Sequence, residues 1–360
     1  MKPMVTNFRL LPDGRWHIGV VAKRTASLED ACHLATTLEQ SAPAGEETTA
    51  WKPATDVVVR GSIYAASPLR EQCAHIELGP HVRKIRATGD RVIEHIAGGA
   101  PVFSLPSAFE RMPMRFERCY GGFDRGAYER LGDPEADEGL RIGAALDSVS
   151  KFAYPRNRRG TGFFVAIDPG RLIGASLPSL DDPDDPVTPE RLLRASPEDW
   201  VAAPRPVALD WVEPFDFPRS AHWGAPPVTF AGHLPELEER IVTEADLASD
   251  RPFPPKPSAR SMCGTLLGHR GIRLRGGEDI RLDNLHPTWR HIRTNLPSDA
   301  PLVRLQPPGC PWFELEPQLD TVVLDLDAKR LSMVWSAKLE VAGKYPDDEL
   351  AQVVAEVRWP

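Results

Sequence analysis

The sequence predicts a mainly β protein, α+β at most, with antiparallel sheets in a β-sandwich-like arrangement, long proline-rich loops and a few short helices. Three observations support this fold class. β-branched segments with alternating apolar residues recur through residues 1–120 and again near the end. Proline occurs 37 times in 360 residues, about twice its usual share, which leaves little room for long helices. The links between the early strands are too short for the crossover helices of parallel pairs.

The first third of the chain reads as a series of short strands. β-branched runs occupy Trp16–Ala26 and Asp56–Ala66. The stretch Cys73–Ile96 reads as three strands, separated by a Gly-Pro pair at 79–80 and a Gly-Asp pair at 89–90. We therefore expect a meander in this part of the chain.

The octapeptide "ERCYGGFD" at 117–124 is open to several interpretations. Met114 and Phe116 alternate with charged residues before it, so we expect a strand that ends in a sharp bend at Gly121 and Gly122, where φ is positive. Cys119 is then a packing side chain. A phosphate-binding loop is disfavoured because neither a helix signal nor a Lys-Ser/Thr pair follows.

The middle of the chain is rich in prolines and turns. Residues 124–155 could hold one short helix, and 233–248 reads as a helix of about four turns. Between them, 177–227 is proline-rich, and its "DDPDD" run is most simply a set of solvated turns.

Strands return towards the end. Residues 271–282 are a hairpin candidate around Gly276 and Gly277. A second hairpin is expected over 319–341, with its turn near 327–329, and acidic residues at 347–349 introduce a possible last helix. We divide the chain into a β-rich part (1–125), a loop- and proline-rich middle (126–235) and a part with C-terminal β-hairpins and short helices (236–360), which together form one compact unit.

Composition excludes several classes of function. The net charge is −8 and no basic block occurs, so nucleic acid is not an expected partner. No stretch approaches the roughly 18 apolar residues of a membrane helix, and the first residues lack a signal peptide. The cysteines are odd in number and never spaced as C-x-x-C, which favours reduced thiols in the cytoplasm; they are Cys32, Cys73, Cys119, Cys263 and Cys310.

Residues that could carry out chemistry are few. No hydrolase, metalloprotease or nucleotide-binding motif is present, and we expect no cofactor, no metal and no enzymatic activity. One alternative is a hydrolase that uses Cys119 with a histidine, the candidates being His95, His222, His269 and His286. Another is a cation site at Asp325 and Asp327, although such a pair is more often the solvent side of a strand.

Further polar and glycine residues are interpreted as structural. We expect turn positions at Gly61, Gly89, Gly121, Gly122, Gly160 and Gly162. Loop-fixing hydrogen bonds are expected from Lys23, Lys52, Asp56, Asp90, Asp124 and Asn157. The only notable basic cluster consists of Arg156, Arg158 and Arg159.

Several blocks, taken in order, carry a family resemblance. The block 51–65, "WKPATDVVVRGSIYA", resembles the pattern K-P-x-T-D-V-x-V-x-G-x-A-Y. Further blocks are 20–26, 82–93, 109–124, 154–164 and 315–341. Together they resemble the bacterial domain-of-unknown-function family 2169, which is found beside type VI secretion genes. The chain departs from the family pattern at Cys119, where alanine is common, at 157–160, and at Ser336 after Trp335.

This resemblance implies a non-enzymatic adaptor or chaperone of the type VI secretion system. Such a protein binds a secreted effector in the cytoplasm and helps to load it onto the VgrG spike and its PAAR tip. Aromatic side chains held between prolines suit such contacts, as does the basic cluster; the expected contact residues are Trp211, Phe215, Phe217, Trp223, Arg156, Arg158 and Arg159. A β-scaffold module that binds carbohydrate or is purely structural stays open as an alternative.

Overall fold

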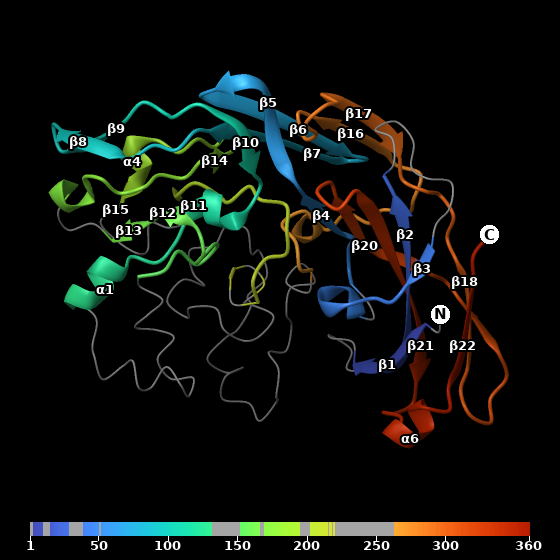
Figure 1. Ribbon diagram of the computed structural model, residues 1–360. Coiled ribbons are helices and arrows are strands. Elements are labelled where there is room, and N and C mark those ends of the chain that lie inside the picture. The colour runs from blue at the N-terminus through green and yellow to red at the C-terminus, as the bar shows by residue number, and fades with distance from the viewer. Residues whose placement is uncertain are drawn as a thin grey trace.

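The computed structural model describes residues 3–9, 15–28, 39–49, 52–131, 152–165, 169–194, 202–214, 216–217, 219 and 263–360. This part of the chain is mainly β, with several antiparallel sheets and only short helices, as the sequence predicts (Figure 1). Figure 1 shows two halves: one holds the large sheets, and the other holds β8, β9, β11, β12, β13, β15, α1 and α4.

The largest sheet joins the two ends of the chain. Its order is β1-β2-β21-β20-β4, with β3 also beside β2. The strands are β1 (Met4–Arg9), β2 (Trp16–Ser27), β3 (Glu39–Ser41), β4 (Asp56–Arg60), β20 (Gln318–Asp325) and β21 (Arg330–Val341). The expected hairpin over 319–341 is confirmed as β20 and β21. β4 and β20 pair in parallel, contrary to the antiparallel expectation, because strands so far apart in the sequence need no short link.

A five-stranded sheet also combines early and late segments, in the order β14-β7-β6-β16-β17. Its strands are β6 (Glu71–Leu78), β7 (His81–Thr88), β14 (Leu180–Asp181), β16 (Asp279–Asp283) and β17 (His291–Asn295). The predicted hairpin over 271–282 is wrong: no strand precedes Gly276, and β16 pairs with β6 and β17. The Glu278 carboxylate accepts the N–H groups of Arg275 (2.6 Å) and Gly276 (2.9 Å), which closes this stretch into a loop.

The C-terminal segment forms a strand where a helix was expected. The only helix there is the short α6 (Asp347–Leu350), and β22 (Val354–Arg358) follows. β22 pairs with β18 (Leu302–Gln306), which also pairs with β19 (Phe313–Leu315). Ala355 and Val357 lie opposite Leu305 and Val303 and pack in one apolar cluster with them. This tertiary pairing outweighs the weak helical periodicity of the segment.

Short pairs and helical turns complete the described fold. The pairs are β5 (Ser62–Leu69) with β10 (Phe109–Pro113), β8 (Ile93–Ala97) with β9 (Ala100–Phe103), β11 (Tyr120–Gly121) with β12 (Thr161–Gly162), and β13 (Phe164–Val165) with β15 (Leu193–Arg194). The other helical segments are η1 (Gly45–Thr48), η2 (Phe116–Arg118), α1 (Arg125–Leu131), η4 (Pro169–Leu172), α4 (Pro189–Leu192) and η9 (Gly268–Arg270).

The predicted meander is partly wrong. The three strands exist as β6, β7 and β8, but β8 leaves the hairpin and pairs with β9. α1 falls within the stretch 124–155 where one short helix was expected. The helix expected over 233–248 lies outside the described residues.

Two apolar clusters cover one face of the long β2–β21 ribbon in succession. Leu331, Met333 and Trp335 belong to the main core, together with residues of the five-stranded sheet such as Ile76 and Leu282. Ala337, next along the same face, packs with β18 and β22 in a second cluster. The six-stranded sheet therefore packs against another sheet at each end, the β-sandwich-like arrangement that the sequence predicts.

The other half of the molecule has its own aromatic core. Tyr154 packs against Tyr120, with 5.0 Å between ring centroids, and against Phe163, with 5.6 Å. These rings are buried with Ile93 and Leu192 from flanking elements. The described chain thus contains two large cores that meet at η2 and β11.

A buried ion pair ties three distant segments together. Lys52 Nζ donates to Asp56 Oδ2 (2.7 Å) and to Thr321 Oγ1 (2.9 Å), and the two charged residues are at most 2% exposed. Asp56 also accepts the backbone N–H groups of Gly264 (3.0 Å) and Thr265 (2.9 Å). The start of β4 is therefore fixed to β20 on one side and to the segment after 263 on the other.

Removal of one partner of this pair should destabilise the whole fold. Lys52→Met leaves the Asp56 carboxylate buried without its cation, a change that costs about 3–5 kcal/mol. We expect this loss in urea unfolding followed by circular dichroism. The matched control is Arg125→Met, which removes an exposed pair with Glu129 and should cost less than about 1 kcal/mol. Equal effects of the two substitutions would contradict the assigned role of Lys52.

His81 makes stability sensitive to acid. Its side chain is 1% exposed, and neither ring nitrogen has a hydrogen-bond partner among the described residues. Burial, with Arg270 and Arg83 nearby, lowers its pKa to about 4 from the usual 6.5. The unfolded chain therefore takes up this proton at higher pH than the folded one does, and stability falls as the pH decreases from 6.5 towards 4.

We predict that His81→Leu reduces this pH dependence. In the wild type the contribution of His81 amounts to about 3 kcal/mol between the two pH limits. The measurement is the free energy of unfolding from pH 7 to pH 4. The control is His95→Leu, at an exposed position on β8. An unchanged slope in His81→Leu together with a changed slope in His95→Leu would show that His81 is not the group responsible.

Candidate functional site

The octapeptide around Cys119 lies where the two large cores meet. Phe116 and Cys119 are buried in the main core, whereas Tyr120 is buried in the aromatic core. The prediction of a strand directly before the bend is wrong. β10 ends at Pro113, and Phe116–Arg118 forms the 3-10 turn η2. A regular strand would place alternate side chains on opposite faces, whereas the turn lets Phe116 and Cys119 reach the same core.

The Gly-Gly pair allows two backbone segments to lie in contact. Gly121 (φ 147°) and Gly122 (φ 115°) both have positive φ. A Cβ atom on Gly121 would lie 2.2 Å from the carbonyl oxygen of Asn157. The Asn157 side chain donates to the carbonyls of Phe116 (2.8 Å) and Tyr120 (3.1 Å). This close contact, and not a ligand, requires glycine at 121.

Other predicted turn glycines have similar surroundings. Gly61 (φ 153°) lies between β4 and β5, and Gly162 (φ 94°) lies on β12. Gly89 and Gly160 have no positive φ, but a Cβ atom would meet Ser107 O at 1.7 Å and Asn157 Nδ2 at 2.4 Å, respectively. At these positions the nearby backbone or side chain leaves no space for a side chain.

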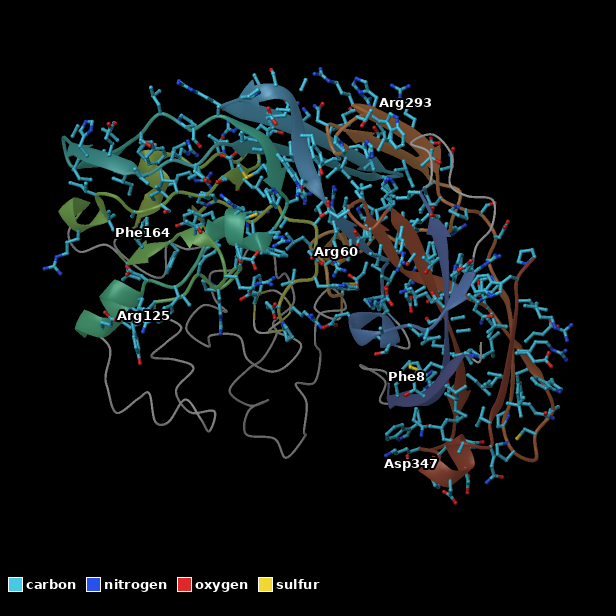
Figure 2. All side chains as sticks on the ribbon, viewed as in Figure 1. Phe8, Arg60, Arg125, Phe164, Arg293 and Asp347 are labelled. Atoms are coloured by element: carbon cyan, nitrogen blue, oxygen red, sulfur yellow. The ribbon has the colours of Figure 1, made fainter. Side chains whose placement is uncertain are left out.

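The first groove beside η2, which we call the Arg60 groove, has a volume of about 590 Å³. Figure 2 shows Arg60 near the middle of the molecule, where the halves meet. The lining residues come from five segments: Arg60, Gly61, Met114, Arg115, Phe116, Glu117, Arg159, Asp210, Asp325, Asp327 and Ala328. Its wall carries charges of both signs, and its apolar part comes from the buried Met114 and Phe116.

Ion pairs organise the wall of the Arg60 groove. Arg60 donates two hydrogen bonds to Asp210 Oδ1, from Nε (3.1 Å) and from Nη2 (3.0 Å). Arg159 contacts Glu213 (3.1 Å), and its guanidinium carbon lies 5.4 Å from the centroid of the Phe116 ring. Arg115 is exposed and has no ion pair among the described residues. Its guanidinium is therefore available to a ligand.

The second groove, which we call the Arg91 groove, has a volume of about 550 Å³. It is lined by Asp90, Arg91, Val92, Ser104, Glu117, Arg118, Thr161, Ser176, Leu177 and Ser179. Glu117 lines both grooves, so they adjoin along η2. Arg118 donates to Asp90 (2.5 Å), which also accepts the Ser179 hydroxyl (3.3 Å).

Cys119 lacks the environment of a nucleophile. The side chain is 0% exposed, burial raises its pKa to about 12, and its Sγ lies 3.5 Å from Arg115 O. A reactive cysteine needs its thiolate form, which is negligible here at neutral pH. The histidine His286 instead accepts N–H groups from Thr288 (3.2 Å) and Trp289 (3.1 Å).

Of the other histidine candidates for a partner of Cys119, the structure describes the side chain of His95 alone. His95 is exposed on β8. The side chains of His222 and His269 lie outside the part that the structure describes.

Asp325 and Asp327 lie near each other but not on one strand face. β20 ends at Asp325, so Asp327 lies in the turn beyond it. The Asp325 carboxylate accepts the Ala328 N–H (2.8 Å), and Asp327 lies 3.5 Å from Arg111. Within the described ranges, no group of three or more His, Cys, Asp or Glu side chains could hold a metal ion.

The expected contact residues differ in how far their side chains are exposed. Arg156 (5% exposed) and Phe217 (3% exposed) are buried and offer little surface to a partner in this conformation. The Trp211 ring is partly buried over the Lys52 ammonium, at 4.8 Å from the centroid. Phe215 and Trp223 lie outside the described residues. Contact with a partner stays a prediction for Trp211.

The remaining arginines of the basic cluster lie at the surface or partly so. Arg159 is exposed in the Arg60 groove. The Arg158 backbone N–H donates to Asp216 (3.3 Å), whose burial raises its pKa to about 6. The expected loop-fixing carboxylate Asp124 accepts the N–H groups of Ala127 and Val165 (both 2.9 Å), and Lys23 donates to Glu47 (2.7 and 2.8 Å).

Sequence reasoning missed most of the groove charges. Arg60 and Asp210 are far apart in the sequence and form no motif. The one sequence signal for a charged site is the position of Arg60 between an apolar run and Gly61. The prediction of solvated turns in the "DDPDD" run is wrong for Asp181, which is 3% exposed and pairs with Arg86 (2.6 Å). Only a known fold reveals that β14 pairs with β7 and puts these charges together.

Thiol reactivity should follow burial. At pH 8, iodoacetamide should modify the exposed Cys73 in the folded protein and leave Cys119 and Cys263 unmodified, because both are buried and have a pKa raised to about 12. Peptide mass spectrometry before and after unfolding in guanidinium gives the measurement. Alkylation of folded Cys119 as fast as Cys73 would contradict its burial in the core.

Comparison with known proteins gives one family match. A family model described as "Uncharacterized protein conserved in bacteria (DUF2169)" matches residues 6–336. No curated protein and no solved structure matches the chain. Among the helices of the described residues, none has the length and apolar character required to cross a membrane.

Proposed function

Because the chain belongs to the DUF2169 family of bacterial proteins, we propose that it is a non-enzymatic adaptor of the type VI secretion system. In this proposal it binds a secreted effector in the cytoplasm and assists its loading onto the VgrG spike and PAAR tip. The adaptor role rests on the family resemblance. The structure supports the proposal with a surface that suits such binding.

The observation that supports this proposal is the pair of adjoining grooves along η2. Each is open, has apolar side chains and charges of both signs in its lining, and is built on segments held by main-chain hydrogen bonds, such as Thr161 N to Cys119 O (2.9 Å). A polypeptide has the same mixture of apolar and charged groups. A preformed surface also loses little conformational entropy on binding. The arrangement therefore suits recognition of a polypeptide.

The adaptor role is tested by deletion of the gene. Culture supernatants of wild-type, deletion and complemented strains are compared by mass spectrometry, with the spike protein as a control for an active secretion system. The proposal predicts loss of one effector from the deletion supernatant and its recovery on complementation. Unchanged secretion of every effector would overturn it.

A variant in the Arg60 groove should weaken effector binding. Arg115→Glu reverses an exposed charge that pairs with no described residue, so the fold should be unaffected. We expect co-purification of the effector to fall about fivefold, the effect of about 1 kcal/mol. The control is Arg293→Glu on β17, an exposed arginine that lies away from Arg60 (Figure 2). Equal recovery with both variants would place the contact outside this groove.

A further inference from the structure

Arg91 is a half-buried cation in the Arg91 groove. Its guanidinium carbon lies 5.2 Å from the centroid of the Phe103 ring, which holds the group in place. Its Nε atom is buried and has no hydrogen-bond partner among the described residues. Burial also lowers its pKa. A buried donor without an acceptor is costly and uncommon in native structures.

The acidic groups near Arg91 already have other partners. Asp181 accepts two hydrogen bonds from Arg86 (2.9 and 2.6 Å) and one from Val187 N (3.0 Å). Asp90, in the same groove, pairs with Arg118 (2.5 Å). Glu117, the other acidic residue that lines the groove, lies 3.6 Å from Arg159. Within the described part of the chain, Arg91 therefore has no carboxylate in ion-pair contact.

The wall around Arg91 is rigid. Ser104 N donates to Val92 O (2.9 Å), and Val92 N donates to Ser104 Oγ (3.0 Å). From the other side, Leu177 N donates to Arg91 O (3.1 Å). Arg91 is thus held between two segments, and its side chain is positioned before any ligand arrives.

An apolar surface adjoins the cation. Val92 is 36% exposed and Leu105, next to Ser104, is 77% exposed. Leu177 forms an apolar part of the groove. A cation beside exposed apolar side chains favours a ligand with a carboxylate next to an apolar residue.

We propose that the Arg91 groove binds an acidic side chain of the partner polypeptide, with Arg91 as its anchor and Val92, Leu105 and Leu177 in contact with the apolar residue beside it. The inference rests on the proposed adaptor function and specifies the chemistry of its partner. The carboxylate meets the guanidinium in a charge-assisted hydrogen bond, and the Ser104 and Ser176 hydroxyls are available as further donors in the groove.

Synthetic peptides test this chemistry directly. The probe is a fluorescein-labelled nonapeptide, acetylated and amidated at its ends, with a central glutamate flanked by leucines. A second peptide has glutamine in place of the glutamate, and a third has glutamine and a free C-terminal carboxylate. Anisotropy with the full-length protein should show about tenfold tighter binding of the glutamate peptide than of the amidated glutamine peptide. Tighter binding of the third peptide would identify a chain terminus as the source of the carboxylate.

Three variants and one control test whether the preference depends on Arg91. Arg91→Gln should abolish it, and Arg91→Lys should retain part of it, whereas the matched control Arg293→Gln should retain all of it. Ser176→Glu, at an exposed groove position, should weaken binding of the glutamate peptide because it supplies a competing carboxylate. This variant keeps the test informative even if Arg91→Gln does not fold.

Failure of the inference can be separated from failure of the adaptor role. No binding of the glutamate peptide at about 1 mM, equal binding of all three peptides, or a preference that persists in Arg91→Gln would overturn the inference. If the deletion strain still loses effector secretion, the adaptor role stands despite such a result. If secretion is unchanged by the deletion, the adaptor role fails whatever the peptides do.

Discussion

The buried contact between Lys52 and Asp56 is the constraint on which the rest of the fold depends. Neither charge can be exposed to water without moving β4, and each is satisfied by groups from distant parts of the chain, namely Thr321 of β20 and the backbone at Gly264 and Thr265. The attraction alone need not stabilise the protein, because desolvation of both groups is expensive. The ion pair instead specifies which segments of the chain come together.

Once β4 is fixed, the neighbouring elements are determined in turn. β4 pairs in parallel with β20, and Gly61 then turns the chain into β5. β5 pairs with β10, and β10 leads into η2. The segment around Cys119 thus reaches the junction between the two cores. There Cys119 enters one core and Tyr120 the other, so a short turn links two halves that pack independently.

The grooves are a consequence of this junction. Glu117 of η2, the segment between the two cores, lines both grooves. The chain has a net negative charge, yet arginines gather at these grooves: Arg60, Arg115 and Arg159 in one, Arg91 and Arg118 in the other. Most have acidic partners at hand. Arg91 and Arg115 have none in ion-pair contact among the described residues, so they are the positions where the proposed partner would gain most.

The fold class, the strands β2, β4, β6 and β7, and the β20–β21 hairpin could be predicted from the sequence, because alternating apolar residues and turn glycines are local signals. The sequence also indicates that Gly121 and Gly122 need unusual backbone angles. Long-range packing, in contrast, makes β22 a strand, keeps the residues before Gly276 in a loop and buries Asp181. The grooves depend on it in the same way, since Arg60 and Asp210, or Arg91 and Leu177, lie far apart in the sequence and meet only through long-range pairing. Local propensity cannot encode such contacts, because burial and partners outside a segment outweigh its own preferences.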